Sequence, residues 1–295
     1  MLVLALPGAS RLAAALAAEL ECDWSEVALH RFPDGESLAR IDVPVKGRCV
    51  AVTANLAHPD DKTLPLLFAG DAARDLGAAQ VGLVAPYLPY MRQDRRFHPG
   101  EALTSRSYAR VLSSTFDFLV TVDPHLHRWH SLADLYPIRT QAVASAPAIA
   151  HWVQRHVPGA LLVGPDAESE QWVSEVAALA SRPFTVMKKT RHGDREVQVV
   201  VDRKLAAPGL TPVLLDDIVS TGATFVAAAG ALREAGFAPP VCVAVHALFD
   251  ADAMWRLMDA GVTRVVTCDS VPHLSNEIAL APLLAHAVRT IADPA

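Results

Sequence analysis

Cysteine is scarce in this chain of 295 residues. The four cysteines, at positions 22, 49, 242 and 268, are far apart and form no Cys-x-x-Cys pair. Zinc sites built from cysteine and the disulfide frameworks of small secreted domains both depend on closely spaced cysteines, so neither class fits. A reducing, cytoplasmic location is therefore expected.

Long hydrophobic runs and basic blocks are missing as well. No run of about 18 apolar residues occurs, because 21 prolines and scattered charges interrupt every candidate, and we expect no membrane-spanning helix. The 26 basic and 32 acidic residues give a net charge of −6. This balance disfavours a nucleic-acid partner. Apolar residues make up 52% of the chain and charged residues 20%, which indicates a compact globular protein.

Short apolar runs alternate with amphipathic segments along the chain. The runs are too short for helices and are bounded by turn residues, which is typical of strands buried on both faces; they span 2–6, 49–53, 81–85, 118–122, 161–163, 213–215, 241–245 and 265–267. Helices are predicted between them, for example over 11–21 with Ser10 as N-cap and over 60–76. This alternation predicts an α/β fold with parallel sheets.

The number of predicted strands suggests two sheets and therefore two domains. Residues 140–147 are small and polar and form the weakest join, and a new helix is predicted over 148–156. The boundary is placed at 143, which gives domains of 1–143 and 144–295. LVTVDPH (119–125) and VLLDDIVSTG (213–222) each end a hydrophobic strand with acidic residues, an internal echo that suggests duplication.

The segment VLLDDIVSTGATF (213–225) joins an apolar strand to a predicted helix through two carboxylates and a loop of small residues. Asp216 and Asp217 can accept hydrogen bonds from sugar hydroxyls. Backbone N–H groups at the start of the helix can point at a phosphate; they belong to Ser220, Thr221, Gly222, Ala223 and Thr224. The alternative is an ordinary strand-to-helix turn with Asp217 as a solvated acid.

This segment resembles the motif that binds 5-phospho-α-D-ribose 1-diphosphate (PRPP) in type I phosphoribosyltransferases and in ribose-phosphate pyrophosphokinases. Four more segments resemble pyrophosphokinase signatures, in the family's order and at its approximate spacing; they are RFPDGES (31–37), YMRQDRRFHPGEALTS (90–105), TVDPHLH (121–127) and GPDAESEQWV (164–173). A lone transferase domain has none of the first three. The resemblance implies two tandem type I phosphoribosyltransferase-like domains, each a mainly parallel sheet flanked by helices. Ser220 and the loop FHPGEALTS are most similar to the archaeal-type, ATP-dependent class.

Two of these segments are candidates for nucleotide binding. Phe32 precedes a Pro-Asp-Gly turn, and Asp34 and Glu36 are acceptors suited to an exocyclic amine such as that of adenine. Arg92 and Gln93 offer donors to a polyphosphate. Ordinary alternatives are a turn with Phe32 in the core and a solvated basic turn. The resemblance implies that all five residues contact ATP, and that RFPDGES does so from a neighbouring subunit.

The run DPHLHRWH contains three histidines, but His125, His127 and His130 lack a compatible ligand set for zinc. The resemblance implies instead that His125 is a ligand or close neighbour of Mg²⁺ and that Asp123 is the matching acid of its motif. Asp166 corresponds to a second magnesium-associated acid. Oxygen ligands together with substrate phosphates suit Mg²⁺, the cofactor that the resemblance implies.

The segment MKKTRHGDREVQV (187–199) is predicted to be a basic hairpin with its turn at 192–194. A charge cluster of this kind is usually a solvated surface. The resemblance implies a loop that closes over the triphosphate, with Lys189 and Arg191 as the catalytic cations. Cationic stabilisation of a transferring phosphoryl group is worth roughly 10³ to 10⁵ in rate.

Taken together, the five motifs imply transfer of the β,γ-diphosphoryl group of MgATP to the anomeric hydroxyl of ribose 5-phosphate, giving PRPP and AMP. The implied assembly is a homo-oligomer with active sites at its subunit interfaces, without nucleic-acid or membrane partners. Two alternatives remain. A phosphoribosyltransferase would use the same 213–225 motif, but RFPDGES and MRQDRR argue against it. A non-catalytic nucleotide-binding paralogue would be expected to have lost motif residues that are present here.

Overall fold

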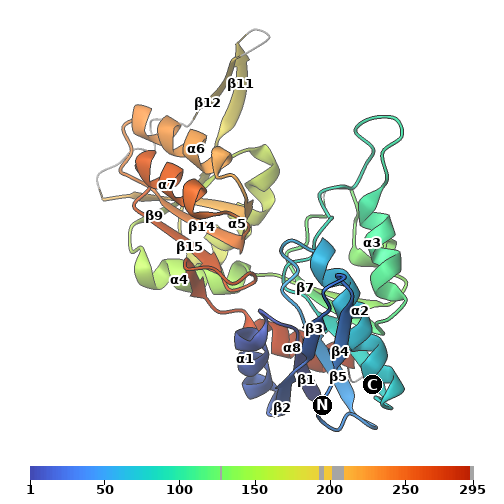
Figure 1. Ribbon diagram of the computed structural model, residues 1–295. Helices are drawn as coiled ribbons and strands as arrows, with labels where there is room; N and C mark the ends of the chain where they lie inside the picture. The colour runs from blue at the N-terminus through green and yellow to red at the C-terminus, as the bar shows by residue number, and fades with distance from the viewer. Residues whose placement is uncertain (127, 193–195, 201–208, 293–295) are drawn as a thin grey trace. The chain divides into compact units, whose positions relative to one another are not determined.

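The computed structural model describes residues 1–126, 128–192, 196–200 and 209–292 (Figure 1). Within it the chain forms two compact units. Unit 1 contains Met1–Ala144, Ser270–Pro272 and Leu280–Ala295, and unit 2 contains Ser145–Asp269 and His273–Ala279. Among the described helices, none combines the length and the hydropathy needed to span a membrane.

Unit 1 is built on a six-stranded parallel sheet with the order β2-β1-β5-β6-β7-β8. The strands are β1 (Leu2–Ala5), β2 (Asp23–Glu26), β5 (Cys49–Thr53), β6 (Gln80–Val84), β7 (Phe118–Val122) and β8 (Arg139–Val143). The central strands are buried along almost their whole length, as the predicted apolar runs require.

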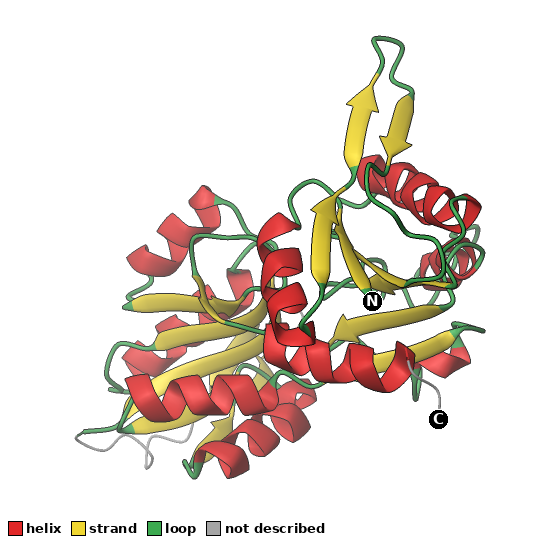
Figure 2. Cartoon of the chain, turned by 90° about the horizontal axis from the view of Figure 1, so that it is seen from below, coloured by secondary structure: helices red, strands yellow, loops and turns green. Residues whose placement is uncertain are grey.

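Helices cover both faces of the strands (Figure 2). In unit 1 they are α1 (Ser10–Leu20), α2 (Asp60–Asp75), α3 (Thr104–Ser113), the short 3₁₀ helix η1 (Leu132–Asp134) and α8 (Ala281–Ala292). The predicted N-cap of the first helix is wrong: Ala9 occupies the cap position, and Ser10 is the first helical residue. Its hydroxyl donates to the Glu26 carboxylate at 2.5 Å instead of capping the helix.

A separate antiparallel hairpin lies between β2 and β5. Its strands, β3 (Ala28–Arg31) and β4 (Ser37–Arg40), pair in register from Ala28 opposite Arg40 to Arg31 opposite Ser37. β4 packs against α2, and the turn of the hairpin carries the RFPDGES motif.

Unit 2 contains a second six-stranded parallel sheet, with the order β10-β9-β13-β14-β15-β16. Its strands are β9 (Ala160–Gly164), β10 (Phe184–Val186), β13 (Thr211–Val219), β14 (Val241–Ala247), β15 (Arg264–Cys268) and β16 (Asn276–Ile278). The helices are α4 (Ala146–His156), η2 (Ala167–Ser169), α5 (Glu170–Ala180), α6 (Ala223–Glu234) and α7 (Ala251–Asp259). The antiparallel hairpin of β11 (Lys188–His192) and β12 (Glu196–Val200) stands away from this sheet in Figure 1.

The two sheets repeat one topology. In chain order, each places its second strand outermost, followed by the first, third, fourth, fifth and sixth. The predicted duplication is therefore confirmed. The two segments that suggested it do not correspond, however. LVTVDPH contains most of the fifth strand of its sheet (β7), whereas VLLDDIVSTG contains most of the third strand of the other (β13).

The chain divides differently from the predicted domains at its C-terminal end. Helix α8 packs on α1 and on β6, β7 and β8, and its apolar residues Leu284, Val288 and Ile291 are buried there. Arg139 of β8 fixes the end of this helix by donating from Nη1 to the Ile291 carbonyl at 2.5 Å. Residues 144–295 thus do not form a single unit. The predicted join at 140–147 also contains the end of β8 and the start of α4.

Candidate functional site

Three carboxylates gather at one edge of the unit 2 sheet. β9 and β13 are adjacent parallel strands, with Leu214 opposite Val163, so their carboxyl ends lie together. Asp216 and Asp217 lie towards the end of β13, and Asp166 follows β9 by two residues. This is the edge at which open α/β sheets bind ligands.

Burial raises the pKa of Asp216 to about 8, and the neighbouring carboxylates of Asp217 and Asp166 contribute to the rise. The backbone N–H of Asp217 donates to Asp216 Oδ1 at 3.0 Å, which opposes the shift. An edge with this excess of acceptors suits sugar hydroxyls or a cation.

Asp166 is the N-cap of η2. Its Oδ1 accepts the Glu168 backbone N–H at 3.2 Å, and its backbone carbonyl accepts the Ser169 hydroxyl at 2.7 Å. These bonds fix the direction in which the side chain leaves the end of β9.

The loop after β13 leads directly into α6, in the strand-loop-helix order that the sequence predicts. Gly222 has φ 74° and is the N-cap of α6, which has no side-chain cap. The Ala223 N–H donates to the Thr221 hydroxyl oxygen at 3.4 Å. The helix dipole favours an anion at this end of α6. Ser220 is half-buried, and Thr221, Ala223 and Thr224 are exposed. These residues form the second part of the unit 2 site.

Arg256 of α7 also reaches this loop. Its Nη2 donates to the Thr221 carbonyl at 3.1 Å, which brings a positive charge to the candidate phosphate loop. No sequence motif marks Arg256, and the sequence reasoning missed it. The contact joins two residues that are 35 positions apart in the chain.

In unit 1, Arg92 and Gln93 lie in the loop between β6 and α3, and both are exposed. The Gln93 N–H donates to the Tyr90 carbonyl at 3.0 Å, and the Gln93 carbonyl accepts the Ser105 N–H at 3.4 Å. Next along the loop, Asp94 is 3.7 Å from Arg128, and only 8% of the Asp94 side chain is exposed. The loop is thus tied to the segment that follows β7.

A glutamate organises the end of this loop. The Glu101 carboxylate accepts the backbone N–H groups of Phe97 at 2.7 Å and His98 at 3.0 Å, and it lies 2.6 Å from His98 Nδ1. Hydrogen bonds from His98 and Phe97 lower the pKa of Glu101. The guanidinium of Arg95 lies over the Phe97 ring, 4.6 Å from its centre. The Glu101 hydrogen bonds and the Arg95 contact therefore hold this part of the loop together.

The RFPDGES motif forms the tip of the β3–β4 hairpin. Asp34 Oδ1 accepts the Glu36 N–H at 3.1 Å, and the Phe32 N–H donates to the Glu36 carbonyl at 2.8 Å. Phe32 is 39% exposed, with its ring edge-on to His30 at 4.5 Å. Phe32 is therefore outside the core, and this aromatic surface is open together with the carboxylates of Asp34 and Glu36.

Asp123 and His125 follow β7, and both are half-buried. Asp123 has φ 35°, and its N–H donates to the Val143 carbonyl at 3.0 Å. Among the described residues, no three His, Cys, Asp or Glu side chains come together as a metal cluster. His127 lies outside these residues. A cation that used His125 or Asp166 would therefore draw most of its ligands from phosphates and water, as Mg²⁺ does.

The structure thus brings most of the candidate residues together in two groups, while Phe32, Asp34 and Glu36 share the tip of the β3–β4 hairpin. Arg92, Gln93, Asp123 and His125 lie beyond the carboxyl ends of the adjacent strands β6 and β7, and the second group lies at the β9–β13 edge. Lys189 and Arg191 belong to β11, opposite Val199 and Val197 of β12, so the predicted hairpin is confirmed. Their side chains, like residues 193–194 of the predicted turn, lie outside the described part of the structure.

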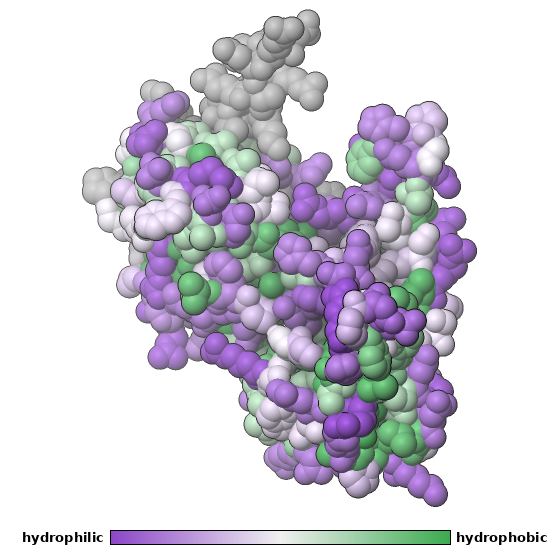
Figure 3. Space-filling model, viewed as in Figure 1, coloured by the Kyte–Doolittle hydropathy of each residue, from purple (hydrophilic) through white to green (hydrophobic). Residues whose placement is uncertain are grey.

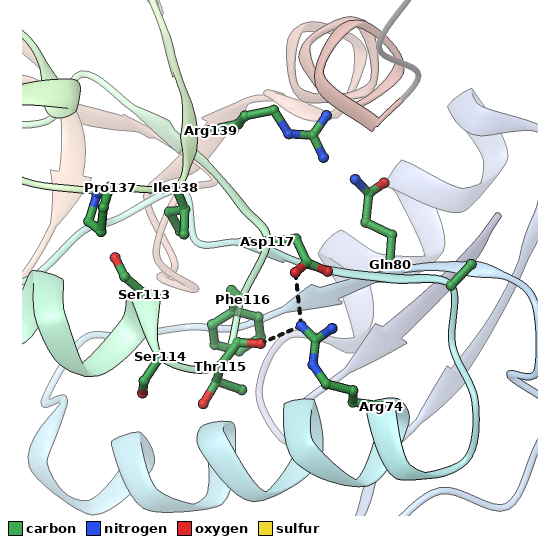
Figure 4. A pocket seen from close by; sticks show the side chains of 11 residues that line it. Arg74, Gln80, Ser113, Ser114, Thr115, Phe116, Asp117, Pro137, Ile138 and Arg139 are labelled. Carbon is green, nitrogen blue, oxygen red and sulfur yellow. Dashed lines mark hydrogen bonds and ion pairs between the residues drawn. The ribbon is translucent and has the colours of Figure 1, made fainter.

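An open depression of about 660 Å³ lies at the opposite, amino edge of unit 1 (Figure 4). Arg74 donates there to Asp117 at 3.0 Å and to the Thr115 carbonyl at 2.9 Å, and the second Asp117 oxygen accepts the Val81 N–H at 2.8 Å. Arg139, also in its lining, holds the end of α8. These charged side chains of the depression therefore make contacts that stabilise the fold. None of the predicted site residues lines the depression.

Comparisons with known proteins agree over the whole chain. The model of the N-terminal domain of ribose phosphate pyrophosphokinase matches residues 1–115, and that of the phosphoribosyl transferase domain matches residues 141–282. Ribose-phosphate pyrophosphokinase of Methanopyrus kandleri is 33% identical over 99% of each chain. The protein of the same name from Methanothermobacter thermautotrophicus is 31% identical over 98% of this chain and 100% of its own.

A solved structure has the same fold. Phosphoribosylpyrophosphate synthetase from Mycobacterium smegmatis superposes with a TM-score of 0.85, covering 99% of this chain and 98% of its own, at 24% sequence identity. The tandem arrangement of two parallel-sheet domains is therefore shared across the full length.

Proposed function

The chain belongs to the ribose-phosphate pyrophosphokinase family, and we propose that it transfers the β,γ-diphosphoryl group of ATP to the anomeric hydroxyl of ribose 5-phosphate. The products are PRPP and AMP. The observation that carries the proposal is the full-length match to an archaeal ribose-phosphate pyrophosphokinase, which covers 99% of both chains. A lone phosphoribosyltransferase domain would match only the second half.

The two groups of candidate residues divide the substrates between them. ATP would bind with its phosphates near Arg92 and Gln93 of unit 1. Its adenine would lie on Phe32 of a neighbouring subunit, with the exocyclic amine donating to Asp34 and Glu36 of that hairpin. Ribose 5-phosphate would bind in unit 2. Asp216 and Asp217 would accept hydrogen bonds from its hydroxyls, and its phosphate would lie on the N–H groups of residues 220–224.

The chemistry asks the protein mainly for positioning and for charge. The anomeric oxygen attacks the β-phosphorus in line and forms a new O–P bond, while the bond from the β-phosphorus to the α,β-bridging oxygen breaks and AMP leaves. The hydroxyl proton is lost. Lys189, Arg191 and Arg92 would neutralise the charge that develops on the transferring group.

His125 and Asp166 are the residues that would hold Mg²⁺. Both residues follow the carboxyl ends of strands. Two protein ligands are enough for Mg²⁺, because this ion takes its other oxygen ligands from the substrate phosphates and water. When bound, Mg²⁺ supplies charge neutralisation and orientation of the phosphates.

The active assembly is proposed to be a homo-oligomer in which RFPDGES completes the nucleotide site of a neighbouring subunit. Exposed apolar side chains support an interface: Leu64 is 59% and Phe68 41% exposed, one turn apart on α2. Hydrophobic surface gathers over this helix in Figure 3. Solvent-exposed apolar patches of this kind mark protein interaction sites. The four free cysteines support a reducing cytoplasm as the location.

The direct test is incubation of the purified protein with ribose 5-phosphate, ATP and Mg²⁺, with PRPP and AMP separated and quantified. Formation of AMP and PRPP in equal amounts is the expected result. Nucleotide formation from PRPP and a free base would favour the transferase alternative. Tight ATP binding without turnover, over varied phosphate and pH, would favour the non-catalytic paralogue.

A further inference from the structure

Backbone conformations that are unusual for non-glycine residues cluster at one edge of unit 1. Within the described chain, five non-glycine residues have φ between 35° and 64°. Glu21 and Ser181 simply end helices α1 and α5 as left-handed caps, a common arrangement. The other three, His58, Tyr90 and Asp123, follow β5, β6 and β7, which are adjacent strands. Such residues persist only where their surroundings hold them, typically near functional sites.

Tyr90 is held by side-chain contacts on two sides. Its hydroxyl donates to Asp60 in the first turn of α2, and its ring lies 4.8 Å from the ring of Tyr108 on α3. Burial and the Asp60 contact raise the pKa of Tyr90 to about 12, so its hydroxyl keeps the proton that it donates. The Tyr108 hydroxyl is in turn 3.3 Å from the Thr63 hydroxyl of α2. Tyr90 thus joins the loop after β6 to the two helices beside it.

The residues that Tyr90 immobilises are the candidate ATP contacts. Its carbonyl accepts the Gln93 N–H at 3.0 Å, which closes a turn over residues 90–93. Arg92 lies inside this turn and is exposed. The direction of Arg92 therefore depends on the conformation of the turn, which begins at the left-handed Tyr90.

We propose that Tyr90 and Asp60 form a positioning pair, which orients the turn carrying Arg92 and Gln93 for nucleotide binding. The proposal rests on the proposed function, because it takes ATP as the ligand of this turn. Neither side chain is required to contact the substrate. Their effect is to hold the turn in its binding conformation before ATP arrives, so that binding need not order it.

Removal of the Tyr90 hydroxyl tests the pair with little other change. Tyr90→Phe keeps the ring contact with Tyr108, and we expect it to weaken binding of a non-hydrolysable ATP analogue roughly three- to tenfold, the effect of losing one hydrogen bond. The KM for ATP should rise by the same factor, while kcat and the KM for ribose 5-phosphate stay within about twofold. Asp60→Asn keeps an acceptor oxygen and should lose less than Asp60→Ala.

Tyr136→Phe is the matched control. Tyr136 is buried in the same unit at 2% exposure, and its hydroxyl has no hydrogen-bond partner in the described structure, so its removal should leave nucleotide binding unchanged. Thermal unfolding midpoints show whether each variant is folded. Unchanged analogue affinity in folded Tyr90→Phe, or equal losses for both substrates, would overturn the proposal. Because analogue binding needs no turnover, this result is independent of whether the proposed reaction occurs.

Discussion

The surroundings of the Asp216 carboxylate disfavour its ionised form. Burial, and then Asp217, raise its pKa from the ordinary 3.8 to about 8. In the unfolded chain the group ionises near pH 4, so its contribution to stability is complete below that pH and is lost as the pH rises towards 8. This cost is consistent with a residue retained for binding rather than for folding.

We expect Asp216→Asn to be more stable than the wild type at pH 8 and to gain progressively between pH 4 and pH 8. The measurement is the difference in thermal unfolding midpoint between variant and wild type, in EDTA so that no metal contributes. Asp34→Asn, at the exposed tip of the β3–β4 hairpin, is the control. A difference that stays constant across the pH range would show that burial does not penalise the Asp216 charge.

Arg256 of α7 adds a positive charge to the candidate phosphate loop from outside the sequence motif of that loop. Its contact with the Thr221 carbonyl uses one of five guanidinium N–H donors and places the charge beside a helix N-terminus that would hold phosphate. We expect Arg256→Ala to raise the KM for ribose 5-phosphate roughly ten- to hundredfold, as for a charge-assisted hydrogen bond, with little change for ATP. Arg256→Lys should restore part of the loss, because it keeps the charge without the planar fork.

Arg233 supplies the control for net charge. It lies in the last turn of α6, the helix whose N-terminus follows the candidate phosphate loop. Arg233→Ala removes the same charge far from the helix N-terminus and should leave both KM values unchanged. Steady-state kinetics with each substrate varied in turn separates the two cases. Equal effects of the two variants would assign Arg256 only a general electrostatic role.

At the scale of elements, buried strands were predictable and edge strands were not. The runs at 49–53 and 118–122 coincide with β5 and β7, because strands covered on both faces must be apolar throughout. β2 has the sequence DWSE and is mostly exposed, and β8 has RTQAV, so neither carries an apolar run. Their place in the sheet comes from backbone pairing with β1 and β7, which no local pattern reports.

The basic hairpin β11–β12 has two possible roles: its cations act in catalysis, or they form only a solvated charged surface. If Lys189 and Arg191 meet the phosphates only in the transition state, their removal should lower kcat and leave both KM values nearly unchanged. We expect Lys189→Ala and Arg191→Ala each to lose on the order of 10² to 10⁴ in kcat. Rapid-quench measurement of AMP formation, compared with steady-state turnover, distinguishes slower chemistry from slower product release.

Lys188→Ala is the matched control for this hairpin, because it removes one charge from the same strand at the adjacent position. It should lose much less activity than Lys189→Ala. Near wild-type turnover in both Lys189 and Arg191 variants would mean that the cluster is only a charged surface. The assignment of the diphosphoryl-transfer cations would then be wrong.

At the scale of the whole molecule, the candidate residues are divided between two units that repeat one topology. Their motifs could be recognised because each is a short stretch of sequence at a loop near the carboxyl end of a strand or at a hairpin. The side-chain contacts that hold these candidate residues in place could not be predicted from the sequence. Tyr90 and Asp60 are 30 positions apart, and their meeting depends on how α2 packs beside β6. The return of α8 to unit 1 likewise depends on tertiary packing.

That division makes shared sites testable by complementation. Phe32→Ala damages only the hairpin of unit 1, and Asp216→Ala damages only the β13 edge of unit 2. If each site combines Phe32 of one subunit with Asp216 of its neighbour, a mixed dimer contains one intact site and one doubly damaged site. Equal mixing with free exchange makes half of the dimers mixed, so about a quarter of the wild-type activity should return.

The matched control mixes Asp216→Ala with Asp217→Ala. Both changes fall on β13, so every site of a mixed dimer keeps one damaged carboxylate and no activity should return. Differently tagged subunits, recovered together after mixing, establish that exchange has occurred. Exchange without recovery in the Phe32→Ala and Asp216→Ala mixture would place both residues in the site of a single subunit. A fully active monomer in sedimentation at assay concentration would exclude shared sites altogether, because isolated subunits could then assemble a nucleotide site without a neighbouring hairpin.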